Sequence, residues 1–261
     1  MTTSRFLKGA MYGIDLAIAA TEPAEYIYDG DDFTQLQMTA ADGALGGYIT
    51  SGEGTPTAEQ IALTPGIALQ IGTSGNADHD SIFMTRQTSV GAFDITINSG
   101  RLVAYETRFR INQGVEVGLF FGLCQPDDTP PTEDTLLVDH TGILGDFDSV
   151  GFHALIHETD VDIDGVTRLK GAATQTGADT MTEDEDALFN TYGFRFDGGN
   201  EIEWFLNNES FDKQIILAAE FPTGQALVPT WSVKTGETVA KNVKVDYWTC
   251  VQALLSSDRP E

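Results

Sequence analysis

Basic residues are scarce in this chain. Its 261 residues include 14 lysines and arginines against 40 aspartates and glutamates, which gives a formal net charge of −26. A surface this acidic repels phosphate groups, so nucleic acid is excluded as a main partner. Two interpretations stay open: a heavily solvated exterior suited to high salt, or a protein displayed on the outer surface of a larger assembly.

Cysteine and long apolar runs are also in short supply. Cys124 and Cys250 form no C-x-x-C motif and each ends an apolar run, so we expect buried thiols, with one disulfide as the alternative. No run approaches the roughly 18 apolar residues of a membrane span, and no membrane partner is expected. Residues 9–20 are similar to a signal peptide, but Asp15 interrupts them, and we interpret them as part of the mature chain.

Turn-forming residues are abundant, because the chain has 27 glycines and 9 prolines, and this favours short strands over long helices. The most regular stretch is 101–124. Apolar side chains alternate over residues 103–111 and again over 115–123, with Gly114 between the two runs. A period of two on both sides of a short turn is typical of a β-hairpin with one buried face. We expect this hairpin in the middle of the main sheet.

Short apolar runs separated by turn residues continue along the whole chain. Further strands are predicted from Phe33 and over 61–63, 67–71, 81–86, 93–97, 150–156, 166–169, 192–196, 202–206, 211–217, 227–233 and 243–251. Turns are predicted at 29–32, 164–165, 197–200 and 207–208, and acidic loops over 125–147 and 174–188. About a dozen short strands predict an all-β sandwich of two antiparallel sheets.

Several segments also resemble a known family. They are Asp31-Asp32-Phe33, DSIF at 80–83, AYETRFRI at 104–111, VGLFFGLCQPDDTPP at 117–131, DSVGF at 148–152, YGFRFDGGNEIEWFLNN at 192–208 and VDYWTCVQ at 245–252. Together they are similar to tailed-bacteriophage virion proteins with a concanavalin A-like, LamG-like jelly roll. The likeness covers nearly the whole chain, and its motifs are structural.

The resemblance implies a non-enzymatic virion protein, most plausibly a capsid decoration or cement protein on the particle exterior, assembled in the host cytoplasm. Its expected partners are the major capsid protein or neighbouring virion proteins, with self-association as a symmetric oligomer. A fibre or appendage component, or a lectin-like module that holds a host glycan, is the alternative. The family brings no catalytic residues.

Three regions are predicted along the chain: an amino-terminal arm over 1–28, a jelly-roll sandwich over 29–252 and a carboxyl-terminal tail over 253–261. The arm contains Arg5 and Lys8, the only basic pair before Arg86, with Phe6 between them. We expect it either to pack along the domain or to dock on an acidic partner. Arg5, Phe6 and Lys8 are therefore candidate partner-binding residues.

Two groups of residues are similar to metal sites. Asp160, Asp162 and Asp164 match the first half of a calcium loop, D-x-D-x-D-G, but its twelfth position holds glycine where a bidentate glutamate is needed. They remain weak calcium candidates, and no cofactor is expected. His153 and His157 would lie roughly 13 Å apart along a strand, so they cannot share a metal and are expected on the solvent face.

Two carboxylates and three tryptophans are the candidates for a sugar site. Glu201 and Glu203 alternate on one strand, as in glucanases of this sandwich class, but the third position of the row is phenylalanine, which argues against a glycosidase. Trp204 and Trp231 share faces with apolar neighbours and are expected in the core. Trp248 falls opposite the apolar face of its strand and is predicted to be an interface or sugar contact.

Overall fold

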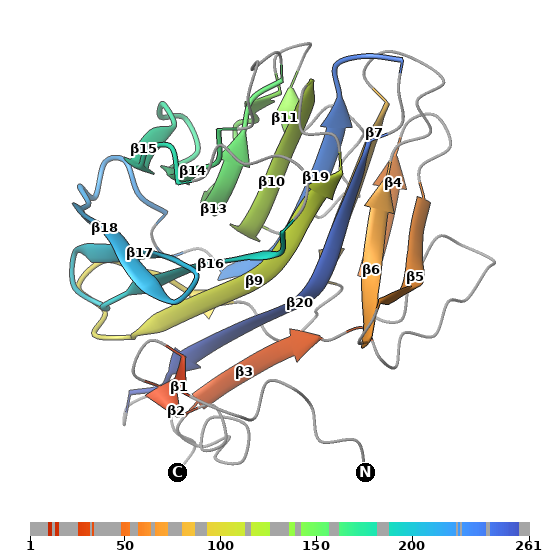
Figure 1. The fold of residues 1–261 in the computed structure, drawn as a ribbon. Coiled ribbons are helices and arrows are strands. Elements are labelled where there is room, and N and C mark those ends of the chain that lie inside the picture. Colours follow the sequence, from red (N-terminus) through yellow and green to blue (C-terminus); the bar gives the residue numbers. More distant parts are fainter. Residues whose placement is uncertain are drawn as a thin grey trace.

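The protein is an all-β sandwich of two antiparallel sheets (Figure 1). The computed structural model describes residues 10–11, 14–15, 26–31, 33, 48–52, 57–63, 66–72, 80–86, 93–112, 116–125, 136–138, 142–156, 162–181, 188–222, 224, 226–238 and 241–255. This part of the chain contains no helix, and hence none long and apolar enough to cross a membrane. The all-β prediction is confirmed.

Each sheet has eight strands. The β10 sheet runs in the order β15 (Gln175–Ala178), β14 (Asp164–Arg168), β13 (Ser149–Ala154), β10 (Val117–Cys124), β19 (Ala226–Thr235), β7 (Ser81–Arg86) and β4 (Tyr48–Gly52), with β8 (Phe93–Asp94) also on β19. The β9 sheet runs β18 (Glu209–Ile215), β17 (Glu201–Leu206), β16 (Asn190–Phe196), β9 (Val103–Asn112), β20 (Asn242–Ala253), β6 (Gly66–Gly72) and β5 (Thr57–Leu63), with β3 (Tyr26–Asp31) also on β20. Short pairs are formed by β1 (Ala10–Met11) with β2 (Ile14–Asp15), and by β11 (Leu137–Val138) with β12 (Ile143–Leu144).

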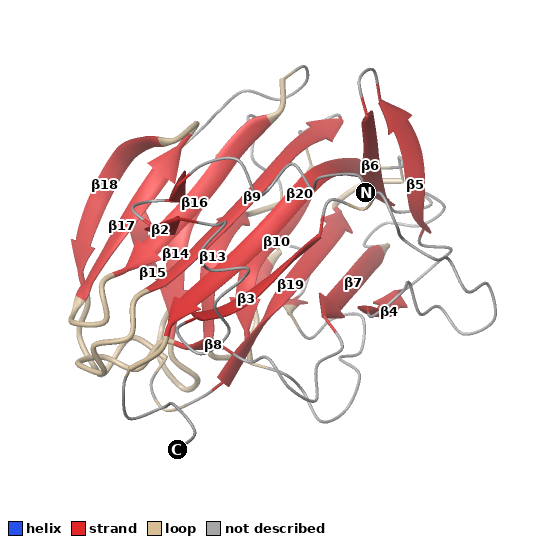
Figure 2. Cartoon of the chain, turned by 90° about the horizontal axis from the view of Figure 1, so that it is seen from below, coloured by secondary structure: helices blue, strands red, loops and turns tan. Residues whose placement is uncertain are grey.

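The main core fills the space between the two sheets. Figure 2, seen from below, shows the strands of the two sheets one over the other. Aromatic rings from both sheets meet there: Phe152 packs on Trp204 at 5.6 Å and Trp231 on Trp248 at 5.3 Å, both edge to face. Aromatic pairs in this geometry add stability beyond the area they bury. Trp204 and Trp231 are fully buried, which confirms their predicted place in the core.

The strands β9 and β10, predicted as a hairpin, do not pair with each other. β9 lies between β16 and β20, whereas β10 lies in the facing sheet between β13 and β19. Their apolar faces meet across the sandwich, where the rings of Phe109 and Phe121 stack at 4.4 Å. The predicted alternation is right and the predicted pairing is wrong, because strands of one sheet and strands of two facing sheets bury the same alternating pattern.

The long strand β20 contains a bulge that reverses which side chains face the core. Val243 and Val245 belong to the core between the sheets. The pairing with β9 shifts after Val245, and Trp248 and Cys250 take the inward positions beyond that point. One extra residue in a strand flips the alternation that follows. The prediction that Trp248 is an exposed contact residue is therefore wrong, since its side chain is fully buried.

A second, smaller core covers the outer face of the β10 sheet. Leu137 and Leu144, from the predicted acidic loop, pack with Phe120 of β10. The Nζ atom of Lys234 donates to the Leu137 carbonyl at 3.2 Å and holds this segment down. Part of the 125–147 loop is therefore a packed layer with its own short β11–β12 pair, and does not simply face solvent.

Two tight turns in the β9 sheet form where they were predicted. Gly198, at φ 79°, lies in the turn that joins β16 to β17. Asn207 and Asn208, at φ 51° and 69°, join β17 to β18. A two-residue hairpin turn requires positive φ at both central positions, as in the Asn207-Asn208 turn, and asparagine tolerates this conformation well.

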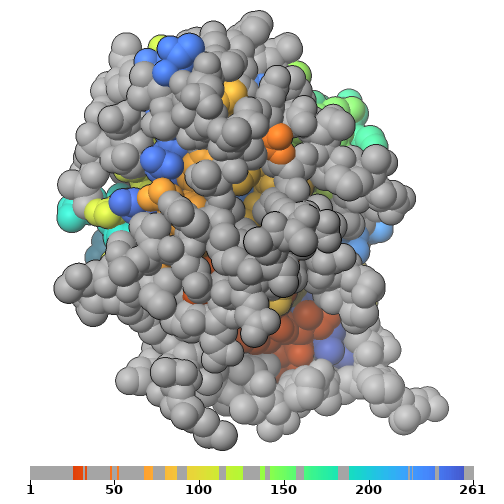
Figure 3. All heavy atoms as spheres, turned by 90° about the vertical axis from the view of Figure 1, so that its right-hand side faces the viewer, coloured from red at the N-terminus to blue at the C-terminus, as the bar shows by residue number. Residues whose placement is uncertain are grey.

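Other predicted turns are strands. Asp164-Gly165 begins β14, and residues 29–31 end β3. Glycine at position 165 allows the Trp204 ring to pack directly on the backbone, because a Cβ atom at this position would lie 2.6 Å from that ring. β3 pairs with β20 and brings an early segment beside the last strand; Figure 3 shows red residues of this early segment at the surface next to blue ones.

Candidate functional site

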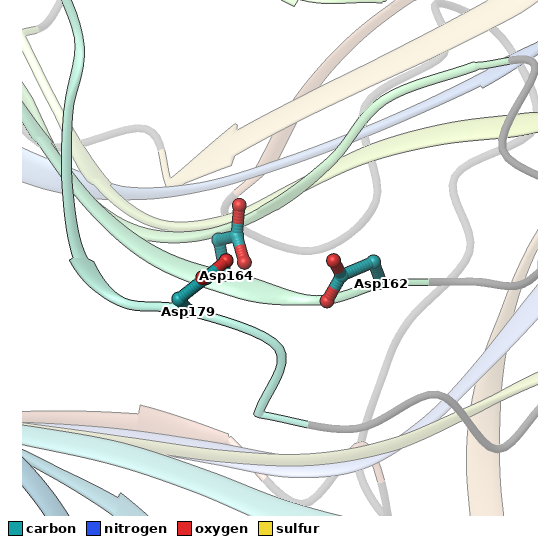
Figure 4. A group of neighbouring side chains, drawn as sticks. All are labelled: Asp162, Asp164 and Asp179. Carbon is teal, nitrogen blue, oxygen red and sulfur yellow. The ribbon is translucent and has the colours of Figure 1, made fainter.

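Three aspartates converge at the edge of the β10 sheet (Figure 4). Asp164 begins β14, Asp162 lies two residues before it, and Asp179 follows β15 directly. One carboxylate oxygen of each lies within 4.8 Å of the other two. The β14–β15 pairing, in which Gly165 lies opposite Ala178, brings the third aspartate to the first two.

Thr180 already donates hydrogen bonds to two carboxylates of this cluster. Its hydroxyl donates to Oδ2 of Asp162 at 3.0 Å, and its backbone N–H donates to Oδ1 of Asp164 at 2.9 Å. Oδ1 of Asp162 is buried and has no hydrogen-bond partner. Calcium takes about six to eight oxygen ligands, so these carboxylates would supply only part of such a site.

The sequence identified two of the three members of the cluster. Asp162 and Asp164 were weak calcium candidates, and the structure brings them together; Asp160 lies outside the described residues. Asp179 was missed because residues 174–188 were interpreted as a solvated acidic loop, whereas β15 occupies residues 175–178. Recognising β15 as the strand that pairs with the strand starting in the D-x-D-x-D-G motif would have identified Asp179.

His153 is buried beneath the β12 segment. Its Nε2 atom lies 2.8 Å from the carbonyl oxygen of Gly142. Burial lowers the pKa of the imidazole, and the hydrogen bond to Gly142 opposes this lowering only in part. The prediction that His153 is a solvent-face histidine is wrong, because the folded 142–147 segment covers it; His157 lies outside the described residues.

Glu203 is held in a network of polar contacts on the outer face of the β9 sheet. It accepts from Arg195 at 2.6 Å and from the hydroxyl of Ser210 at 2.7 Å, and Lys213 lies 3.5 Å away and also reaches Glu201. Burial raises the pKa of the Glu203 carboxyl, but these partners outweigh it and hold that pKa below its usual value. A glycosidase's general acid needs a raised pKa, so this arrangement favours a structural role.

Trp248, the predicted contact residue, belongs to a buried polar network. Its Nε1 donates to the hydroxyl of Tyr48 at 2.8 Å, and that hydroxyl donates to Oδ2 of Asp31 at 2.9 Å. The guanidinium of Arg86 lies 5.0 Å from the centre of the Tyr48 ring and pairs with Asp29 at 3.2 Å. The network ties β3, β4, β7 and β20 together and leaves Trp248 out of reach of a ligand.

The remaining sequence candidates divide between core and undescribed segments. Cys124 and Cys250 are both buried free thiols, as expected. Cys124 packs in the second core and Cys250 in the main one, on different sheets. The predicted partner-binding residues Arg5, Phe6 and Lys8 lie outside the described residues.

No protein-family model matches the chain, and no curated protein matches it either. Several solved structures do match the chain. The carbohydrate recognition domain of Emp47p aligns with a TM-score of 0.57 at 13% identity over 86% of this chain and 94% of its own. A protein of unknown function from Shewanella oneidensis MR-1 aligns with 0.56 at 13% over 91% and 90%. Peanut lectin aligns with 0.56 at 12% over 89% and 99%.

These likenesses cover most of both chains and establish the fold. The protein is a concanavalin A-like jelly roll, as its sequence predicted. Identities this low carry no function across, because one sandwich fold hosts many unrelated sites. Function has to be argued from the surface of this chain.

Proposed function

We propose that the protein is a non-enzymatic structural protein of a tailed-bacteriophage particle, which binds the outer shell and stabilises it. The sequence resemblance supports this role, and one surface feature carries it. β18 is an edge strand of the β9 sheet, and all of its residues are exposed except Gln214, which lies against Gly177 of β15. The large apolar side chains of Phe211, Ile215 and Leu217 on and after it are 43%, 61% and 59% exposed.

An open apolar edge is a hazard for a protein that works alone. Unpaired N–H and C=O groups recruit other strands, and free proteins usually cover or charge such edges. Lys213 provides one charge in the middle of β18, but Phe211 and Ile215 flank it. An edge of this kind fits a surface that a neighbouring subunit covers in an assembly.

A second group of exposed apolar side chains lies at the other side of the sandwich. Ile143 of β12 and Leu155 after β13 are 51% and 38% exposed. The contact between His153 and Gly142 holds these two segments together. Two separate adhesive surfaces suit a protein that bridges neighbouring subunits, because cement action means burying apolar area across their junctions.

Cosedimentation with purified shells that lack the protein tests this role. The full chain should pellet with shells and raise the temperature at which they break open. The double variant F211S/I215S should bind at least about tenfold more weakly, whereas K213S on the same strand should bind normally. Deleting residues 1–25, the part of the predicted arm that precedes β3, should also abolish binding while the domain still folds. Normal binding by F211S/I215S would rule out β18 as the contact, and failure of the wild-type chain to bind would reject the role.

A carbohydrate-binding module is the second candidate. Its support is the fold, which this chain shares with the Emp47p carbohydrate recognition domain and peanut lectin. The aspartate cluster of Asp162, Asp164 and Asp179 is the place where calcium would contribute. A glycan array probed with and without calcium tests this second role, which predicts glycan binding that calcium strengthens.

A further inference from the structure

Two cationic residues lie on neighbouring strands on the outer side of the β9 sheet. Arg110 of β9 lies directly opposite Lys244 of β20 in the strand register, and Gln70 of β6 lies beyond Lys244. Arg110 is the only arginine in the described part of the chain without a carboxylate partner. Lys244 has no ion pair among the described residues either.

This pairing is unexpected on electrostatic grounds. Like charges directly opposite on neighbouring strands destabilise a sheet. The chain has 40 acidic residues that could have neutralised them, and its other described arginines all find one. A cation pair left open in so acidic a protein has the charge arrangement of an anion-binding site.

Neighbouring residues hold the Arg110 side chain in place. Its guanidinium lies 4.9 Å from the centre of the Phe189 ring, and that of Arg108 lies 5.0 Å from the same ring. Arg108 is itself fixed by Asp246, at 2.5 Å. A stacked guanidinium keeps its N–H groups free at the edge, where they match the two oxygens of a carboxylate or sulfate.

We propose that Arg110 and Lys244 bind the carboxylate or sulfate of an acidic sugar, with Phe189 holding the guanidinium in place. This inference goes beyond shell adhesion and does not depend on it. The net charge of −26 repels dense polyanions such as nucleic acid, but allows a ligand that presents isolated charges. The outer face around the pair is polar, with Gln70 directly opposite Lys244, and suits a polar sugar better than the apolar centre of a protein contact.

Calorimetric titration of the full chain with galacturonic acid, which presents a single carboxylate, tests the proposal, with its neutral methyl ester as the matched ligand. The acid should bind and the ester should not, and rising salt should weaken binding. R110Q and K244Q should each weaken binding about tenfold or more, as expected for the loss of a charge-assisted hydrogen bond. K170Q removes the same charge from an exposed lysine outside the β9 sheet and should bind within about twofold of wild type.

Each alternative outcome overturns the proposal in a different way. Equal binding of acid and ester removes the role of the charge. An equal loss in K170Q shows general electrostatic attraction with no site. Binding of a single-glutamate peptide but not of the sugar assigns the pair to a protein partner. R110Q and K244Q relieve a like-charge contact, so neither should lower the melting temperature, and shell binding should be unchanged in both.

Discussion

The buried network around Trp248 makes a sharp prediction about stability. Replacing Tyr48 by phenylalanine removes a single oxygen atom and leaves the ring in place. That oxygen accepts from Nε1 of Trp248 at 2.8 Å and donates to Asp31 at 2.9 Å. Tyr48 and Trp248 are both fully buried, so water cannot replace the lost partner of the indole N–H without disturbing the core.

The size of the effect follows from the burial of the orphaned donor. A buried polar group without a partner costs about 1–3 kcal/mol, more than the net worth of an ordinary hydrogen bond. Tyr247 offers a matched control, because its hydroxyl also donates to a carboxylate, Glu106 at 2.6 Å, but at a half-buried place on the outer face. Y247F should therefore cost about 1 kcal/mol or less.

Urea unfolding followed by tryptophan fluorescence measures both variants. With an m-value of about 3 kcal/mol/M, Y48F should lower the midpoint by roughly 0.3–1 M at unchanged m. Y247F should shift it clearly less. The reasoning fails if Y48F unfolds at the wild-type midpoint, or if the two variants are equally destabilised, since either result would mean that Trp248 finds another partner.

Three further predictions concern other parts of the molecule. G165A should destabilise the fold by about 1–3 kcal/mol in the same assay, because its Cβ would meet the rigid Trp204 ring at 2.6 Å. Stability should decline as pH falls below the unfolded histidine value of 6.5, because the lowered pKa of His153 lets the unfolded chain bind the proton first. His153 should contribute at most about 1.4 kcal/mol per pH unit to this slope, and H153Q should lack that contribution. D179N should raise the melting temperature in metal-free buffer, because it relieves repulsion within the aspartate cluster.

The sequence predicted the class of fold because alternation and turn residues act locally. The runs on β9 and β10, the turn at Gly198 and the Asn207-Asn208 turn were all readable as patterns of neighbours. Which strands pair was not readable in the same way. β9 and β10 follow each other closely in the chain yet lie in opposite sheets, because a sandwich core accepts the same inward pattern from either arrangement.

The errors at candidate sites have local physical causes. A bulge after Val245 turned Trp248 inward, and no composition signal marks that extra residue. Asp179 joins Asp162 and Asp164 only through the β14–β15 hairpin, whose second strand, Gln175–Ala178, has no apolar alternation to reveal it. Arg110 and Lys244 could not be paired before the register of β9 and β20 was known.

We propose that this protein covers a phage shell through its open sheet edge. Cryo-electron microscopy of shells incubated with the full chain tests this proposal. We expect density for the sandwich at symmetry-related positions on the outer surface, with β18 and its Phe211 and Ile215 side chains against a neighbouring subunit. Shells without such density, or bound protein with β18 facing solvent, would contradict it.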